Sequence, residues 1–255
     1  MRPGPPFARE SDNTMTSPQP KATLHLIPVG LGDAPINDWL PSAVQSVAGG
    51  LSVYIAENAK TARAFLKLMQ LARPLQEITI HELGPRVENT TLEEWLRPLK
   101  SGQDIGLVSE AGCPAVADPG SRAVTIAHNW GMNVKPWVGP SSILLGLMAS
   151  GLDGQRFAFH GYAPVDATER AKQLKLWENN SAKNKQTQLL IETPYRNNAM
   201  FAGLLGNLKG NTRLCVARSI TTSEEWIRTL TVAQWKTQPP PALDKHPTLF
   251  LFLAQ

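Results

Sequence analysis

From Thr23 onward, short apolar runs alternate with longer stretches of helical spacing, and this alternation limits the fold more than any other feature of the sequence. In the first half of the chain, the apolar runs are typical of strands. These predicted strands cover residues 23–28, 51–56, 75–83, 105–109 and 134–138. The predicted helices between and after them cover residues 36–47, 59–71, 92–99, 121–129 and 141–150. A strand–helix repeat of this kind indicates an α/β domain with a mostly parallel sheet.

After residue 151 the alternation changes, because only two clear helices separate the predicted strands. The strands cover residues 157–161, 188–192, 213–218, 226–230 and 248–253, and the helices cover residues 167–178 and 197–208. Fewer helices per strand favour a mixed sheet. We therefore predict two α/β domains. The N-terminal domain covers residues 23–151 with a mostly parallel sheet, and the C-terminal domain covers residues 152–255 with a mixed sheet.

Residues 1–22 precede this pattern and contain five prolines but almost no apolar side chains. They lack the apolar stretch of a secretory signal, so we predict a disordered tail. Met15 is a plausible true start, since the patterned sequence begins shortly after it.

Composition and cysteine usage exclude several classes of protein. An apolar content of 42% is enough for a folded core. The longest apolar run, residues 143–152, is far shorter than the ~20 residues that span a bilayer. Cys113 and Cys215 are too few for a disulfide scaffold and too far apart for a zinc site, and the histidines show no metal-ligand spacing. We therefore expect a cytoplasmic protein with reduced thiols, no membrane segment and no metal.

The net charge of +4 conceals an asymmetry between the two halves. Residues 1–150 carry 12 basic and 13 acidic side chains, whereas residues 151–255 carry 13 basic and 8 acidic side chains. A positive second half suits an anionic partner such as RNA. The alternative is a set of ordinary solvated helix faces, and on charge alone this alternative is the more common one.

Four loops lie where such a fold places ligands, beyond the carboxyl ends of predicted strands. Each is rich in glycine, proline and small polar residues, and they cover residues 28–33, 109–120, 139–142 and 192–196. Gly30 and Gly32 alone also suit a tight turn, because a dinucleotide-binding fingerprint requires a third glycine where this chain has Pro35. Residues 139–142 also suit a helix start capped by serine. Residues 109–120 are the strongest signal, since packing alone rarely needs so long a run of small residues.

Taken in order, these loops resemble those of the S-adenosylmethionine-dependent methyltransferases with the tetrapyrrole methylase fold. The closest resemblance is to the branch that 2′-O-methylates a cytidine of small-subunit ribosomal RNA. That branch carries P-T-P-I-G-N, S-D-A-G-T-P, D-P-G, P-G-P-S-A, E-S-P-Y-R and A-R-E-L-T. The matching segments here are P-V-G-L-G-D (28–33), S-E-A-G-C-P (109–114), D-P-G (118–120), V-G-P-S-S (138–142), E-T-P-Y-R (192–196) and A-R-S-I-T (217–221).

The resemblance implies two α/β domains, usually in a homodimer, with S-adenosylmethionine folded into the cleft between them. It assigns donor binding to loops of both domains. The residues concerned are Pro28, Gly30, Gly32, Gly112, Cys113, Pro114, Val116, Ser141, Ser142, Thr193 and Thr248. Because this donor carries no phosphate, it requires backbone groups that approach closely rather than a phosphate-binding helix start.

The chain departs from the ribosomal branch at two motifs. Where that branch has E-D-T-R after the second strand, this chain has E-N-A-K (57–60). In A-R-E-L-T-K, the acid is here Ser219 and the lysine is Thr222. These departures leave donor binding intact but weaken the inference to a ribosomal substrate. They indicate a divergent subgroup, for which an acceptor other than that of the branch stays open.

Transfer of a methyl group to a ribose hydroxyl requires a group that removes or holds the hydroxyl proton. The hypothesis is that Glu57 and Glu110 shape the acceptor site and that Asp118 contacts the substrate, because all three lie in predicted cleft loops. The side chains expected to hold RNA are Arg63, Arg196 and Arg218 for phosphates and Tyr195 for stacking on a base. For each of these residues the alternative is a contact that braces a loop.

Three classes of function follow. The favoured one is an S-adenosylmethionine-dependent methyltransferase that O-methylates RNA, with a ribose 2′-hydroxyl of ribosomal RNA as the acceptor. The second keeps the donor but changes the acceptor to a tetrapyrrole or a protein. The third is a non-catalytic RNA-binding module, which the intact donor loops disfavour.

Overall fold

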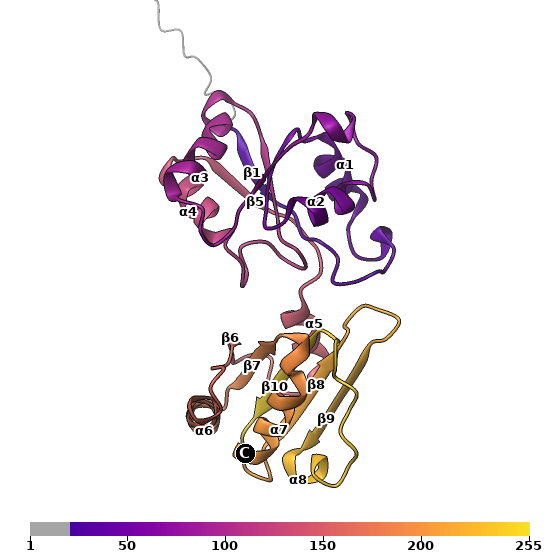
Figure 1. Cartoon of the computed structure of the whole chain (residues 1–255), viewed down its shortest axis with the longest axis vertical. Coiled ribbons are helices and arrows are strands. Elements are labelled where there is room, and N and C mark those ends of the chain that lie inside the picture. The colour runs from indigo at the N-terminus through magenta and orange to yellow at the C-terminus, as the bar shows by residue number, and fades with distance from the viewer. Residues whose placement is uncertain (1–20) are drawn as a thin grey trace, which may run out of the picture.

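Two five-stranded sheets, arranged one above the other along the long axis of the molecule, form the framework of the protein (Figure 1). The computed structural model describes residues 21–255. The predicted start at Met15 and the predicted tail, except for its last two residues, lie outside the described residues. Helices flank both sheets, so the predicted fold of two α/β domains is confirmed.

The first sheet is parallel throughout, with strand order β3-β2-β4-β1-β5. Its strands are β1 (Thr23–Leu26), β2 (Val53–Ala56), β3 (Thr79–Glu82), β4 (Ile105–Val108) and β5 (Asn133–Pro136). The neighbouring strands β2 and β4 are buried along their whole length. Parallel strands that are covered on both faces need apolar side chains at every position, which explains the continuous runs V-Y-I-A and I-G-L-V.

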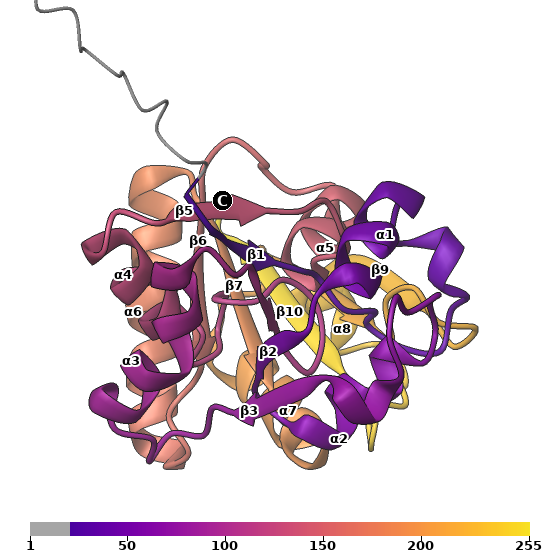
Figure 2. The ribbon, with the colours of Figure 1, turned by 90° about the horizontal axis from the view of Figure 1, so that it is seen from above.

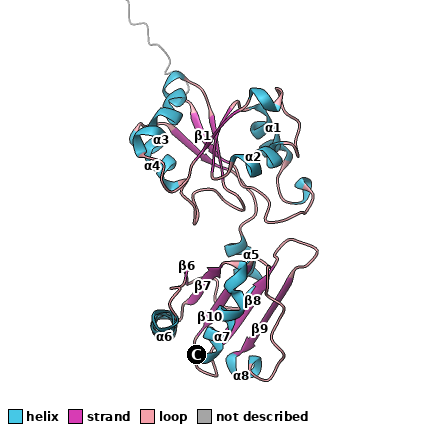
Figure 3. Cartoon of the chain, viewed as in Figure 1, coloured by secondary structure: helices cyan, strands magenta, loops and turns pink. Residues whose placement is uncertain are grey.

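Helices cover both faces of this first sheet (Figures 2 and 3). They are α1 (Ser42–Gly50) and α2 (Ala59–Leu66) on one face, and α3 (Asn89–Leu96) and α4 (Ser121–Asn129) on the other. Strand β2 supplies both cores, since Tyr54 and Ala56 pack toward α1 and α2 whereas Val53 and Ile55 pack toward α3 and α4. This is the alternation expected of a strand.

The second sheet is mixed, with strand order β6-β7-β10-β8-β9. Its strands are β6 (Phe157–Tyr162), β7 (Thr187–Glu192), β8 (Arg213–Arg218), β9 (Trp226–Thr231) and β10 (Thr248–Leu253). The pair β6–β7 is parallel, and the remaining pairs are antiparallel. One face packs against α6 (Ala167–Asn184), α7 (Asn197–Asn207) and α8 (Val232–Trp235).

Helix α5 (Ser142–Ser150) packs on the other face of the second sheet, although the sequence grouped this helix with the first half. Its Leu147 lies in one hydrophobic cluster with Leu249 of β10. Gly146 faces β10 so closely that an added Cβ would lie 2.4 Å from Cδ2 of Leu249. The helix is apolar on nearly every side, so its sequence does not say which sheet it covers. The chain therefore crosses from one sheet to the other between β5 and α5 (Figure 1).

Prolines account for the main differences between predicted and observed elements. The predicted helix over residues 36–47 is divided into a 3-10 turn (Ile36–Asp38) and helix α1, because Pro41 fixes the backbone at the helix start. The predicted strand over residues 75–83 begins as a 3-10 turn after Pro74, so β3 starts only at Thr79. Helix α8 is too short for the helical period to be recognised in the sequence. A capping box formed by Thr231 and Gln234 stabilises its start.

Gly106 in β4 leaves room for the side chain of Tyr54 in β2. The ring of Tyr54 is fully buried, and its hydroxyl donates to the carbonyl oxygen of Ala48. A Cβ at position 106 would lie 2.4 Å from a ring carbon of Tyr54. Both residues belong to paired strands inside the sheet, so neither backbone has space to move. The packing of the first domain therefore requires glycine at this position.

We expect Gly106→Ala to destabilise the protein by about 1–3 kcal/mol, the usual cost of overpacking a core. The measurement is the free energy of unfolding in urea. Gly84→Ala is the matched control, because an added Cβ there meets nothing within 4 Å. We expect this control to change stability by less than about 0.5 kcal/mol. Equal stability of the two variants would contradict the close fit between Gly106 and Tyr54.

Candidate active site

A cleft of about 350 Å³ lies between the two domains. Its first wall consists of the loops that follow β1, β2 and β4, together with the start of α5. Its second wall consists of residues in or next to β6, β7, β8 and β10. A parallel sheet brings the carboxyl ends of its strands to one edge, and the first wall is built at that edge.

Backbone hydrogen bonds join the first two predicted loops. The N–H of Val29 donates to the carbonyl oxygen of Gly112, and the N–H of Gly112 donates to that of Val29, both at 2.9 Å. Gly112 has φ = 75°, a left-handed conformation that glycine adopts without strain. The third loop contacts the first where Pro28 meets Gly139, at which an added Cβ would lie 2.3 Å from the proline ring. Three loops that are distant in sequence therefore form one surface.

The loop over residues 109–120 is held in an unusual conformation by its own side chains. Asp118 Oδ1 accepts hydrogen bonds from the backbone N–H groups of Ala115 at 2.9 Å and Gly120 at 2.7 Å. Ala115 has φ = 67° and Ala117 has φ = 59°, in a region that alanine rarely occupies. Burial raises the pKa of Asp118, although these two hydrogen bonds act in the opposite direction. Asp118 therefore braces the loop while it also lines the cleft.

Three carboxylates face the cleft from the first domain, those of Glu57, Glu110 and Asp118. Burial raises the pKa of Glu57, and the negative charges of Glu110 and Asp118 raise it further, while the backbone N–H of Glu110 opposes them. A carboxylate with a raised pKa accepts a proton more readily. The structure thus places the two residues predicted to shape the acceptor site in one cleft, and Glu57 is protonated more readily there than an ordinary glutamate.

The start of α5 completes the first wall. Ser141 occupies the N-cap position, but its hydroxyl makes no capping hydrogen bond, contrary to the predicted capping role. Ser141 and Ser142 line the cleft instead. A helix start leaves backbone N–H groups unpaired and favours negative charge. Cys113 lies beside this turn, with Sγ 3.5 Å from the carbonyl oxygen of Pro140 and a pKa raised by burial.

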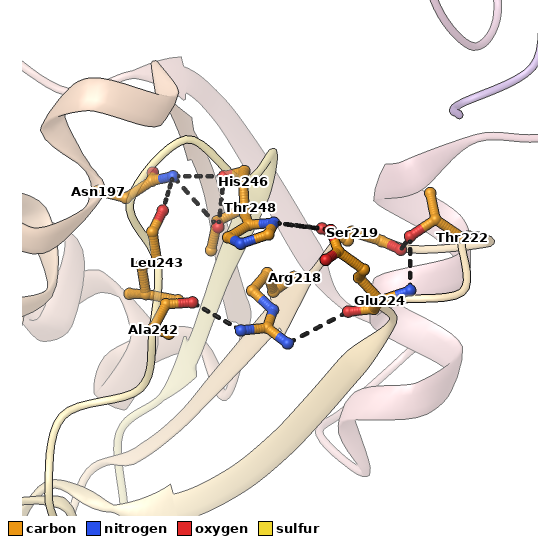
Figure 4. Close-up of polar contacts among 9 residues, drawn as sticks. All are labelled: Asn197, Arg218, Ser219, Thr222, Glu224, Ala242, Leu243, His246 and Thr248. Atoms are coloured by element: carbon orange, nitrogen blue, oxygen red, sulfur yellow. Dashed lines mark hydrogen bonds and ion pairs between the residues drawn. The ribbon is translucent and has the colours of Figure 1, made fainter. Parts of the chain in front are cut away.

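A network of polar side chains shapes the second wall (Figure 4). Asn197 at the start of α7 donates through Nδ2 to the carbonyl oxygens of His246 at 2.7 Å and Leu243 at 3.3 Å. The same nitrogen lies 3.2 Å from Oγ1 of Thr248. These contacts fix the segment that leads into β10, from which Pro247 and Thr248 line the cleft.

Ser219 anchors the other side of this network (Figure 4). Its hydroxyl lies 3.2 Å from Nδ1 of His246, which in turn lies 3.4 Å from a carboxylate oxygen of Glu224. Its backbone N–H donates to the carbonyl oxygen of Pro247 at 2.9 Å. Because both side-chain contacts meet one imidazole nitrogen, the three groups do not form the relay that activates a serine nucleophile. Ser219 therefore holds the wall of the cleft together.

Six of the eleven residues assigned to donor binding line the cleft, namely Gly112, Cys113, Val116, Ser141, Ser142 and Thr248. The other five are Pro28, Gly30, Gly32, Pro114 and Thr193, which do not line it. An added Cβ at Gly30 would lie 3.0 Å from the ring of Trp39, and one at Gly32 would lie 2.3 Å from Cγ2 of Thr222. These two glycines thus allow close packing, and Gly32 lets the two domains touch. The donor-binding roles themselves stay predictions.

Four of the five side chains predicted to hold substrate do not line the cleft. Arg218 donates to backbone carbonyl oxygens at 2.7 and 3.3 Å, and Arg196 pairs with the buried carboxylate of Glu192. Both arginines therefore brace loops. Tyr195 is 82% exposed, and Arg63 is exposed on α2. The roles of these four residues toward RNA stay predictions.

Sequence reasoning missed the apolar and aromatic part of the second wall. These residues are Phe159, Tyr162, Ile191, Ala217, Ile220 and Leu249. Five of them lie in strands, where they look like ordinary core positions, so composition and period contain no signal for them. The available signal was their place in or beside the motifs, since Ala217 and Ile220 lie within A-R-S-I-T and Ile191 precedes E-T-P-Y-R.

Other candidate groups do not point to a second site. His160 stacks on Trp177 with ring centroids 4.1 Å apart, and its Nε2 lies 2.7 Å from Oε1 of Gln188. Burial lowers the pKa of His160. Within residues 21–255, no group of three or more histidine, cysteine or acidic side chains is arranged to hold a metal ion. Over the same residues, no helix combines the length and the apolar character needed to cross a membrane.

Comparison with known proteins finds similar chains both by structure and by sequence. No protein-family model matches the chain. Among solved structures, the methyltransferase CobJ is similar over 92% of this chain and 94% of its own, with a TM-score of 0.59 and 17% sequence identity. Among curated proteins, Ribosomal RNA small subunit methyltransferase I of Xylella fastidiosa is 31% identical over 217 residues, which span 85% of this chain and 75% of that relative. The protein of the same name from Bacillus subtilis is 28% identical over 206 residues, which span 80% and 66% of the two chains.

The two-domain fold, the loops around the cleft and these relatives define a methyltransferase with the tetrapyrrole methylase fold. The likeness to CobJ, at 17% identity, supports the fold alone. The curated relatives identify the family within this class of methyltransferases. The chain belongs to the ribosomal RNA small subunit methyltransferase I family. The resemblance seen in the loop motifs and the predicted enzyme class are thereby confirmed.

The raised pKa of Glu57 leads to a prediction for stability. An acid that binds its proton more tightly in the folded than in the unfolded state destabilises the folded state once the pH exceeds its ordinary pKa of 4.5. We therefore expect Glu57→Gln to unfold at a higher temperature than the wild type at neutral pH. The difference should shrink as the pH falls through the raised pKa to below 4.5, where the carboxyl group is protonated in both states.

Thermal unfolding measured across this pH range tests the prediction. Glu93→Gln is the matched control, because Glu93 is exposed on α3, away from the cleft residues. We expect no comparable pH-dependent difference in the control. A Glu57→Gln variant less stable than the wild type at neutral pH would show that the carboxylate is stabilised by its surroundings.

Proposed function

We propose that the protein uses S-adenosylmethionine to methylate a ribose 2′-oxygen of small-subunit ribosomal RNA. The observation that carries this proposal is the cleft between the domains, where loops of the donor-binding type meet a group of three carboxylates. The names of the curated relatives, Ribosomal RNA small subunit methyltransferase I, support RNA as the acceptor.

The cleft fits the donor in size and in the character of its surfaces. A volume of about 350 Å³ falls in the usual range of small-molecule sites. Ala217, Ile220 and Leu249 form a buried apolar part of the second wall, which suits an adenine ring. The first wall is rich in glycine, alanine and serine, so its backbone groups are accessible to a ligand.

The charges of the cleft also fit the donor. S-adenosylmethionine carries a positive sulfonium, a positive ammonium group and a negative carboxylate, and it supplies the methyl group. The carboxylates of Glu57, Glu110 and Asp118 favour the positive groups. The start of α5, with the uncommitted hydroxyl of Ser141, favours the negative one. A phosphate-bearing cofactor would meet repulsion from the same three carboxylates.

Glu57 is the residue that we assign to the acceptor proton. A ribose 2′-hydroxyl loses its proton as its oxygen accepts the methyl group. The carboxylate of Glu57 takes up this proton, and its raised pKa brings it closer to the range that suits a general base near neutral pH. Glu110 holds the hydroxyl beside it. The two walls contribute the rest by fixing the position of the reacting groups.

The alternative acceptors, a tetrapyrrole or a protein, have no observation of their own in their favour. The likeness to CobJ extends to the fold alone. A non-catalytic binding module does not agree with the family. The homodimer and the cytoplasmic location stay predictions.

The first test uses methyl-labelled S-adenosylmethionine, the pure protein and an extract from cells that lack the gene. We expect label in small-subunit ribosomal RNA, at a position that resists alkaline cleavage, because a 2′-O-methyl group removes the hydroxyl that alkali requires. Label confined to proteins or small molecules would show that RNA is not the acceptor. Absence of S-adenosylhomocysteine binding in calorimetry would contradict the proposal that S-adenosylmethionine is the methyl donor.

Substitution of the carboxylates tests their roles. Glu57→Gln should lower the rate of transfer at saturating RNA by about 10²–10⁴-fold, the usual contribution of a general base. Glu110→Gln should lower it by a smaller factor, because Glu110 positions the hydroxyl without taking its proton. Glu93→Gln on α3 is the control and should retain the wild-type rate. Wild-type rates in both cleft variants would show that neither carboxylate acts on the acceptor.

A further inference from the structure

Strand β6 contains a bulge at the point where it reaches the cleft. Phe159 pairs with Leu189 of β7, and Tyr162 pairs with Ile191, so β6 has one more residue than β7 between these two pairs. Gly161 lies within this stretch and has φ = 66°. A glycine with positive φ is typical of a β-bulge that redirects a side chain.

The bulge brings two aromatic rings to the same side of the sheet. Residues three apart in a regular strand point to opposite faces, yet Phe159 and Tyr162 both line the cleft. His160 points to the other face, where its ring stacks on Trp177 of α6. The bulge therefore adds Tyr162 to a wall that a regular strand would not let it reach.

The two rings differ in their surroundings. Phe159 is half-buried against the hydrophobic cluster that includes Ile191 and Leu249. Tyr162 is 57% exposed, and it belongs to the edge strand of the second sheet. Tyr162 therefore lies at an open side of the cleft, whereas Ala217 and Leu249 lie at its buried side.

This arrangement gives the methyl donor and the RNA acceptor different parts of the cleft. The buried apolar side suits the adenine of the donor, which leaves the open side to the acceptor. A large exposed ring is costly in water but suits an unpaired base, because aromatic rings stack on the bases of single-stranded RNA. The carboxylates of Glu57 and Glu110 line the same cleft from the other domain, where the ribose of that nucleotide would lie.

On the basis of the proposed function, we propose that Tyr162 stacks on the base of the nucleotide whose ribose is methylated. The sequence had assigned stacking to Tyr195, which is more exposed and does not line the cleft. The base is thus held by the second domain while the hydroxyl is held by the first. The bulge at Gly161 is the local feature that makes this possible.

The test compares Tyr162→Ala, Tyr162→Phe and Phe157→Ala with the wild type. Isolated small ribosomal subunits and methyl-labelled S-adenosylmethionine serve as substrates, and calorimetry with S-adenosylhomocysteine reports the donor site. We expect Tyr162→Ala to raise KM for the subunits by about 5- to 150-fold, the effect of losing one stacked base. The affinity for S-adenosylhomocysteine and the unfolding temperature should not change. Tyr162→Phe should restore KM. Phe157→Ala is the matched control and should keep KM, because Phe157 is an exposed aromatic residue of the same strand that does not line the cleft.

Each contrary result has a distinct meaning. An unchanged KM in Tyr162→Ala would overturn the stacking role while the proposed function stands, because the wild type labels RNA in the same assay. Loss of S-adenosylhomocysteine binding in Tyr162→Ala would assign the ring to the donor instead. Failure of Tyr162→Phe to restore KM would show that the hydroxyl, and not the ring face, is required. Absence of label in RNA with the wild type would overturn the proposed function itself.

Discussion

Two backbone hydrogen bonds between Val29 and Gly112 fix the geometry on which the whole cleft depends. They join the loops that follow β1 and β4, which are neighbours in the first sheet. With these loops fixed, Gly139 can pack on Pro28 and bring the start of α5 to the cleft. The unfavourable conformations of Ala115 and Ala117 cost of order 1–3 kcal/mol each. The hydrogen bonds to Asp118 offset part of this cost and hold the loop in this conformation.

Features with a strong local signal could be predicted from the sequence. The bounds of α4, β8 and β10 agree with prediction to the residue, because each is a short periodic or apolar segment between clear turns. The first-wall loops were also recognisable, since glycine and proline mark backbone shapes that other residues disfavour. The placement of α5 and the aromatic part of the second wall depend on which distant segments meet. The bulge at Gly161 shifts side chains by a single residue, and no pattern of period two reveals such a shift.

The departures from the ribosomal branch have local structural explanations. Asn58 caps α2, where its side chain accepts hydrogen bonds from the backbone N–H groups of Lys60 at 2.9 Å and Thr61 at 3.3 Å. Asparagine caps helices about as well as aspartate, so this change leaves the turn after β2 intact. Ser219 stands where the branch has an acid and is tied to His246. Both replacements form local contacts of their own, and Glu57, one of the three carboxylates that face the cleft, is retained.

Within residues 21–255, the chain passes between the two sheets only once, in the short segment from the end of β5 to the start of α5. Helix α5 is fixed to the second sheet, and Gly139 within this segment packs on Pro28 of the first domain. The one covalent connection between the sheets is therefore held from both sides. A change of its length would displace the start of α5 and with it the part of the cleft that Ser141 and Ser142 form.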